Sequence, residues 1–120
     1  METVAMEKRE QIYEGKAKIL YTTDNPDLVI QYFKDDTTAF NNQKFAINQG
    51  KGELNNIISS YFMECLHKVG IKTHFVKKID ERNQLVKKVQ IIPLEVIVRN
   101  ISAGSFCKKF GLERGIILEK

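Results

Sequence analysis

The sequence contains few cysteines and histidines and no long apolar run, which are the features typical of several classes of protein. Only two of its 120 residues are cysteine and two are histidine. Cys65 and Cys107 stand far apart with no Cys-x-x-Cys spacing, which argues against a disulfide scaffold and a zinc site. His67 and His74 have no metal-ligand spacing with a partner. No apolar run approaches the roughly 20 residues of a membrane span, so we expect no membrane partner.

A targeting segment and a strong charge are also missing. Residues 1–10 are mixed in charge and lack the apolar centre of a signal peptide, so we expect a cytoplasmic protein with a solvated, frayed leader. The formal net charge of +4, from 19 basic and 15 acidic residues, is too mild to demand nucleic acid as a partner. It does suit a pocket that binds several phosphates.

What is present predicts an α+β fold with an antiparallel sheet. A hydrophobic content of 42% in 120 residues allows a useful core. Apolar runs between turn signals predict strands over residues 12–14, 17–21, 28–33, 73–79 and 85–89, the first three as an antiparallel meander. Residues 35–42 are polar and predict a connecting loop. Near the end, residues 106–110 predict a helical turn that stops at Gly111, and residues 115–119 a last strand.

The clearest helix opens at residues 51–56, carries its apolar stripe from residue 54 to residue 69 and stops at Gly70. Apolar residues recur along it at helical spacing: Leu54, Ile57, Ile58, Tyr61, Phe62, Cys65, Leu66 and Val69. We expect this face to pack on the sheet, with Cys65 as a small core residue, each large side chain contributing ~1.5–3 kcal/mol. The helix indicates fold rather than function.

Residues 91–99 combine a strand pattern with charged groups. Glu95 and Arg99 are four apart, so in a strand they share one side, while Pro93 marks a break or an edge. Small residues and Ser105 follow, which lets backbone N–H groups approach a phosphate beside the guanidinium. The alternative is a buried ion pair on an edge strand followed by an ordinary turn. Composition by itself favours that alternative.

The turn Gly15-Lys16-Ala17-Lys18 is a second candidate site. Its amides and two ammonium groups can cover the phosphates of a nucleotide. The turn is not a Walker A loop, and similar glycine–lysine turns are common.

Three motifs occur in order along the chain: Gly-Lys-Ala-Lys at residues 15–18, Thr-Ala-Phe-Asn at residues 38–41, and Ile-Ile-Pro-Leu-Glu-x-Ile-Val-Arg-x-x-x-Ala-Gly-Ser at residues 91–105. This ordered set resembles the signature of the phosphoribosylaminoimidazole-succinocarboxamide synthase (SAICAR synthetase) family of purine biosynthesis. The resemblance covers about residues 12–120. It implies an ATP-dependent ligase that joins L-aspartate to carboxyaminoimidazole ribonucleotide (CAIR), with Mg²⁺ as cofactor and with ADP and phosphate as products.

The resemblance also implies roles for single residues. Those implied to bind ATP are Gly15, Lys16, Ala17, Lys18, Lys87, Val89 and Ile91. Arg99 and Ser105 would bind the 5′-phosphate of CAIR, and Glu95 would help to position the magnesium. No side chain is implied as a general acid, base or nucleophile. Asn41 stands where some members carry an acidic residue, so no role is given to it.

For the architecture, the resemblance implies a SAICAR synthase-like fold: an antiparallel β-sheet lobe with a packed helix and an ATP-grasp- or kinase-like nucleotide cleft. Residues 1–87 would form the nucleotide-binding lobe and residues 88–120 the start of a substrate-binding lobe. Members are considerably longer and commonly form homodimers, and the Asp-x-Lys-x-Glu-Phe-Gly motif of their second half is absent here. We therefore expect an N-terminal half that is inactive alone.

Three other interpretations stay open. A pI of about 9.1 permits a non-catalytic nucleotide- or nucleic-acid-binding β-rich module, although the basic residues are not concentrated. A kinase lobe of another kind would also carry a glycine-containing hairpin over its nucleotide. The third is a half-domain that binds ligand without turnover.

Overall fold

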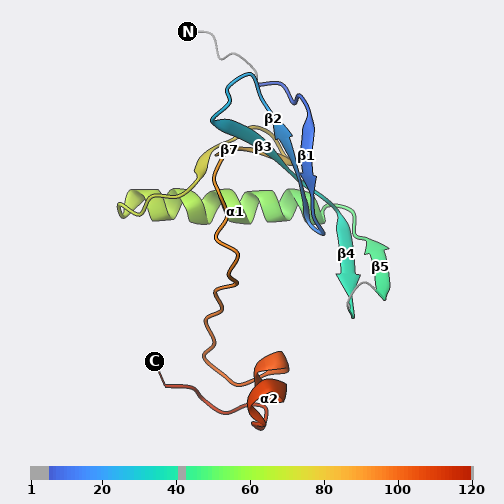
Figure 1. The fold of residues 1–120 in the computed structure, drawn as a ribbon, viewed down its shortest axis with the longest axis vertical. Helices are drawn as coiled ribbons and strands as arrows, with labels where there is room; N and C mark the ends of the chain where they lie inside the picture. Colours follow the sequence, from blue (N-terminus) through green and yellow to red (C-terminus); the bar gives the residue numbers. More distant parts are fainter. Residues whose placement is uncertain (1–5, 41–42, 120) are drawn as a thin grey trace. The chain divides into compact units, whose positions relative to one another are not determined.

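The computed structural model describes residues 6–40 and 43–119. The chain divides into two units, Met1–Gln90 and Ile91–Lys120. The first combines an antiparallel sheet with a long helix, which confirms the α+β fold (Figure 1). Neither helix of the described residues is long and apolar enough to cross a membrane.

Five antiparallel strands form the main sheet, in the order β1-β2-β3-β7-β6. Their bounds are β1 Gln11–Glu14, β2 Lys18–Thr22, β3 Leu28–Phe33, β6 Phe75–Lys78 and β7 Asn83–Lys87. The predicted meander of the first three strands is confirmed. Strand β6 is shorter than the predicted strand over residues 73–79, and β7 begins and ends two residues earlier than the predicted strand over residues 85–89. The N-terminal leader lies outside the described residues up to residue 5. The prediction that it frays is wrong at Arg9 and Glu10, whose backbones pair with Thr22.

The core lies on the central strands of this sheet. The buried apolar side chains are Val29, Ile30, Phe33, Phe75, Leu85 and Val86. Strand β3 contributes three of them because it is flanked by β2 and β7 and contacts the helix α1. Its β-branched residues suit such a covered central strand.

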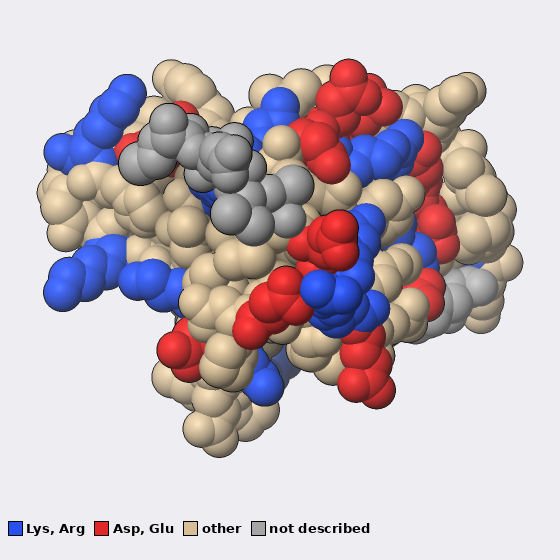
Figure 2. All heavy atoms as spheres, turned by 90° about the horizontal axis from the view of Figure 1, so that it is seen from above, with Lys and Arg blue, Asp and Glu red and all other residues tan. Residues whose placement is uncertain are grey.

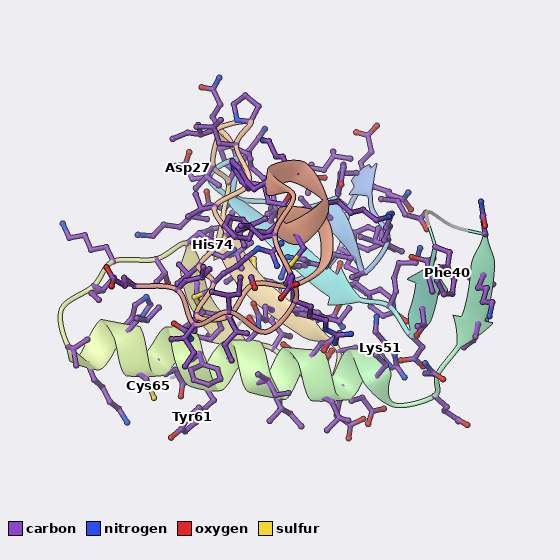
Figure 3. The ribbon with its side chains drawn as sticks, turned by 90° about the horizontal axis from the view of Figure 1, so that it is seen from below. Asp27, Phe40, Lys51, Tyr61, Cys65 and His74 are labelled. Carbon is purple, nitrogen blue, oxygen red and sulfur yellow. The ribbon has the colours of Figure 1, made fainter. Side chains whose placement is uncertain are left out.

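Helix α1, Lys51–Lys68, contacts β3, β6 and β7, but not with the face that the sequence predicts. Its buried residues are Gly52, Asn56 and Ser60, which recur every four residues. The predicted core face is exposed instead, including Tyr61 at 62%, while Cys65 is only half-buried. Figure 3 shows Tyr61 and Cys65 directed away from the strands. The prediction was wrong because the small side chains on one face let the helix backbone approach the sheet closely. An apolar stripe in the sequence does not by itself identify the surface against which the helix packs.

The close approach is tightest at Gly52. A Cβ atom there would lie 2.4 Å from the carbonyl oxygen of Phe33, so this position requires glycine. Farther along the helix, the seam with the sheet is polar. Asn56 Nδ2 donates to the carbonyl of Asp80 at 2.8 Å, and Gln84 Nε2 donates to Ser60 Oγ at 3.1 Å.

Residues 35–42 do not form the predicted loop. Strand β4, Asp36–Ala39, pairs antiparallel with β5, Lys44–Ile47, in a two-stranded sheet. Thr37 and Thr38 suit a strand despite their polarity, because β-branched residues favour extended backbone. Asn41 lies outside the described residues.

The second unit contains the helix α2, Gly104–Phe110, which ends at Gly111 with φ of 64° and confirms the predicted helical turn. The strand predicted over residues 91–99 is absent from the described residues, as is the one over residues 115–119. Only a single bridge joins Ile101 and Ile117. Val96 and Val98 are each 87% exposed. A strand requires a hydrogen-bonded neighbour, and the described part of this unit offers residues 91–99 none.

Candidate functional site

The turn at residues 15–17 joins β1 to β2 and is closed by a hydrogen bond from the N–H of Gly15 to the carbonyl of Lys18, 2.8 Å long. The carbonyl of Ala17 accepts from the N–H of Lys34, also at 2.8 Å. In the described part of the chain, the N–H groups of Lys16 and Ala17 donate to no other residue. The side chains of Lys16 and Lys18 are exposed. The turn therefore offers free amides beside two ammonium groups, which is the chemistry of a phosphate site.

Lys87, another residue implied to bind ATP, lies away from this turn. Lys18 pairs with Phe33 at one end of β3, and Lys87 pairs with Leu28 at the other end. Five positions of an antiparallel strand correspond to roughly 17 Å. A ligand that contacts both Lys18 and Lys87 would have to be long, as a nucleoside triphosphate is. Val89 follows β7 and Ile91 begins the second unit, and both are exposed.

Arg99 and Ser105 are brought together in the second unit. Arg99 Nη2 donates to Ser105 Oγ at 3.3 Å, and Nη1 donates to the carbonyl of Ala103 at 3.3 Å. The guanidinium carbon lies 5.9 Å from the ring centre of Phe106. Because Ala103 begins the turn into α2, these contacts hold the guanidinium over the small-residue loop.

An open cavity of about 670 Å³ lies beside this pair. Its lining residues are Ile97, Arg99, Ser105, Phe106, Lys109, Phe110, Leu118 and Glu119. Lys109 is a second cation here, and no sequence pattern singles it out. The lining thus combines two cations and a hydroxyl with one carboxylate, that of Glu119, and with apolar side chains, and its cations and apolar walls suit a ligand that joins a phosphate to a flat ring.

Glu95 is exposed and does not line this cavity. Among the described residues, the guanidinium of Arg99 donates to Ala103 and Ser105 rather than to Glu95, so the structure does not support the alternative of a buried ion pair. Nor do they contain a group of three or more histidine, cysteine, aspartate or glutamate side chains able to hold a metal ion. Glu95 is therefore a single free carboxylate.

Sequence reasoning missed the strongest ion pair of the first unit. Arg82 donates to both carboxylate oxygens of Asp35, at 2.7 and 2.8 Å, and Asp35 Oδ1 also accepts the N–H of Gly52 at 2.8 Å. Hydrogen bonds from Arg82, then from Gly52, hold the pKa of Asp35 well below its usual value. The pair is 47 positions apart, so no local pattern signals it. It fixes the start of α1 to the end of β3.

The SAICAR synthetase family model matches residues 11–120 of the chain. The chain belongs to the SAICAR synthetase family. It is 58% identical over 115 residues to a phosphoribosylaminoimidazole-succinocarboxamide synthase of Neorickettsia sennetsu, covering 95% of this chain and 48% of that protein. It is 61% identical over 104 residues to the synthase of a Wolbachia species from Brugia malayi, covering 87% and 43%.

Solved structures of the SAICAR synthetase family share the fold. A synthase from Ehrlichia chaffeensis matches with a TM-score of 0.86 and 55% identity over 92% of this chain and 47% of that one. A SAICAR synthetase in complex with ADP matches with a TM-score of 0.83 and 44% identity, covering 90% and 46%. The chain thus spans about half the length of the relatives that it matches.

Proposed function

We propose that this chain is part of an ATP-dependent ligase that joins L-aspartate to CAIR and yields SAICAR, ADP and phosphate in purine biosynthesis. One observation carries the proposal: the Arg99–Ser105 pair beside an apolar-walled cavity, in a chain of the SAICAR synthetase family. CAIR combines a phosphate monoester with a flat heterocycle. A guanidinium and a hydroxyl donate to the phosphate, while the apolar walls cover the ring.

The reaction has to activate a carboxylate, because oxide cannot leave when an amine attacks. An oxygen of the CAIR carboxylate attacks the γ-phosphorus of ATP, and the bond from that phosphorus to ADP breaks. The aspartate amine then attacks the acyl carbon, the carbon–oxygen bond to phosphate breaks, and the amine gives up a proton. Positioning and charge neutralisation supply most of the catalysis of such a phosphoryl transfer. No nucleophilic side chain is required.

In this scheme, the nucleotide lies along the first unit. The amides of Lys16 and Ala17, with the ammonium groups of Lys16 and Lys18, hold its phosphates, and Gly15 permits the turn. Lys87, which pairs at the other end of β3, would lie beside the adenine, and Val89 and Ile91 are the further residues proposed to contact it. The roughly 17 Å along β3 matches an extended nucleotide. A relative of known structure binds ADP, which supports nucleotide binding by this chain.

Glu95 is the residue that would hold magnesium at the reacting carboxylate. The ion, when bound, neutralises charge that develops on the phosphoryl oxygens. One carboxylate leaves room for waters and for substrate oxygens. Residues 1–87 act as the nucleotide-binding lobe and residues 88–120 begin the substrate-binding lobe. We expect the whole protein to work in the cytoplasm as a homodimer.

The test is ADP release in the presence of CAIR, L-aspartate and Mg·ATP. We expect residues 1–120 to bind Mg·ATP without turnover, because the chain spans only about half the length of the relatives that it matches. A longer gene product that contains this sequence should release ADP only when CAIR and aspartate are both present. If neither chain binds ATP, the proposal fails. Turnover by residues 1–120 alone would mean that the metal ligands are assigned wrongly.

A nucleic-acid-binding module is the weaker candidate. In Figure 2 the basic and acidic side chains are intermixed on the face displayed, rather than gathered into a basic surface. Binding driven by a phosphate backbone requires a concentration of positive charge and would fall steeply with salt. Weak binding to single-stranded RNA that is insensitive to salt would dismiss it.

A further inference from the structure

Lys34 lies directly after β3, and its side chain is only 13% exposed. Its backbone N–H donates to the carbonyl of Ala17 at 2.8 Å. Its ammonium group donates to the carbonyl of Gly15 at 3.3 Å. One residue thus holds the two carbonyl groups on either side of Lys16. A lysine that is both largely buried and bonded to a turn in this way is uncommon, since lysine side chains are mostly exposed.

Two carboxylates fix the ammonium group in this position. Lys34 Nζ lies 2.7 Å from Glu14 Oε2 and 3.0 Å from Asp36 Oδ2. Glu14 ends β1 and Asp36 begins β4, so Lys34 connects both strands to the turn between β1 and β2. Charge-assisted hydrogen bonds of this length are among the stronger ones in proteins.

These contacts determine what the turn presents outward. With the carbonyls of Gly15 and Ala17 bound to Lys34, the N–H groups of Lys16 and Ala17 keep no acceptor among the described residues. Carbonyl oxygens would repel a phosphate, and amide hydrogens attract it. The charge of Lys34 is itself neutralised by Glu14 and Asp36. The ammonium group is therefore poorly suited to bind a phosphate directly.

We infer that Lys34 is a positioning residue for phosphate binding: it holds the carbonyl groups of the turn inward so that the amides of Lys16 and Ala17 are ready for the phosphates of a nucleoside triphosphate. This inference rests on the proposed function, because it concerns the same nucleotide site. It adds a residue outside the Gly-Lys-Ala-Lys motif.

The experiment compares ATP with adenosine by isothermal titration calorimetry on residues 1–120. Lys34→Met should weaken ATP binding roughly tenfold, the loss of one charge-assisted interaction, while adenosine binding changes less than about twofold. Lys34→Arg keeps a cation between the two carboxylates and should restore most of the ATP affinity. Lys72→Met removes an exposed lysine and is the matched control, with no change for either ligand.

A second variant covers the case in which Lys34→Met does not fold, as judged by circular dichroism. Glu14→Gln keeps the side-chain shape and removes one charge that fixes Lys34. It should weaken ATP roughly threefold and leave adenosine unchanged. Equal weakening of ATP and adenosine, or unchanged ATP affinity in the folded variants, would overturn the role of Lys34 alone. If residues 1–120 do not bind ATP, the same variants are compared in the longer gene product; ATP binding by neither chain would overturn the proposed function, and this inference with it.

Discussion

Asp35 and Arg82, 47 positions apart, form a two-pronged ion pair with Oδ1–Nη1 and Oδ2–Nη2 distances of 2.7 and 2.8 Å. Glu53, in the first turn of α1, lies 3.6 Å from the same guanidinium. The hydrogen bond from Arg82 is the main cause of the lowered pKa of Asp35, and the carboxylate likewise raises the pKa of Arg82. This cluster anchors the beginning of the helix to the sheet.

The Asp35–Arg82 pair predicts acid-sensitive stability. A carboxyl whose folded pKa is lowered stabilises the fold above its unfolded pKa of about 3.9, and that stability is lost as pH falls toward the folded pKa. Asp35→Asn should therefore lower the free energy of unfolding by a constant amount above about pH 5, and the difference from wild type should shrink below about pH 4. Urea unfolding from pH 7 to pH 2 measures this. Asp27→Asn, at an exposed turn, is the control, and a gap that stays constant to pH 2 would contradict the prediction.

The buried hydrogen bonds between α1 and the segment around β7 predict different losses of stability for two substitutions. Asn56 is fully buried and donates to the carbonyl of Asp80, so Asn56→Ala leaves that carbonyl without a partner and should cost ~1–3 kcal/mol of unfolding free energy. Gln84 Oε1 is buried with no partner among the described residues. Gln84→Met removes that oxygen at similar volume together with the Nε2 donor to Ser60 Oγ, so the gain and the loss partly offset and it should cost about 1 kcal/mol, less than Asn56→Ala. Thermal and urea unfolding compare the two variants. A larger loss of unfolding free energy from Gln84→Met than from Asn56→Ala would contradict this account of the buried hydrogen bonds.

The outward apolar face of α1 predicts tolerance to polar substitution. Ile58 is 52% exposed, so Ile58→Gln should change the unfolding free energy of residues 1–120 by no more than about 0.5 kcal/mol. Ile30, 2% exposed on β3, is the contrast: Ile30→Ala should cost ~2–5 kcal/mol. Urea unfolding of both variants measures the difference. A large loss of unfolding free energy from Ile58→Gln would indicate that the apolar face of α1 belongs to the core of this chain.

Under the proposed function, Arg99 predicts a change in substrate affinity rather than in nucleotide affinity. Arg99→Ala should raise the Kd for CAIR roughly tenfold or more, because a charge-assisted contact to its phosphate is lost, and should leave the Kd for ATP unchanged. In a longer product the KM for CAIR should rise in the same way. Arg114→Ala removes an exposed cation of the same unit and serves as the control. An unchanged affinity for CAIR would remove Arg99 from this role.

Local patterns are sufficient for much of the first unit. The bounds of β3 follow from an apolar run, the turn between β1 and β2 from a glycine between two such runs, and the end of α1 from Gly70, which has a positive φ. The three ordered motifs also indicate the family. These features depend on residues close together in sequence, so the sequence carries them directly.

Contacts between distant residues decided the rest. The sequence marked α1 as amphipathic, but only packing on β3, β6 and β7 selected the face with Gly52, Asn56 and Ser60, because a helix can approach most closely where its side chains are small. The β-branched run at residues 91–99 forms no strand, because a strand needs a hydrogen-bonded neighbour and the described part of its unit offers none. Lys34 and the Asp35–Arg82 pair owe their surroundings to strands that meet only in the folded chain. Sequence determined the central strands, helix α1 and the family, and tertiary structure determined which other segments pair as strands and which groups each element turns toward its neighbours.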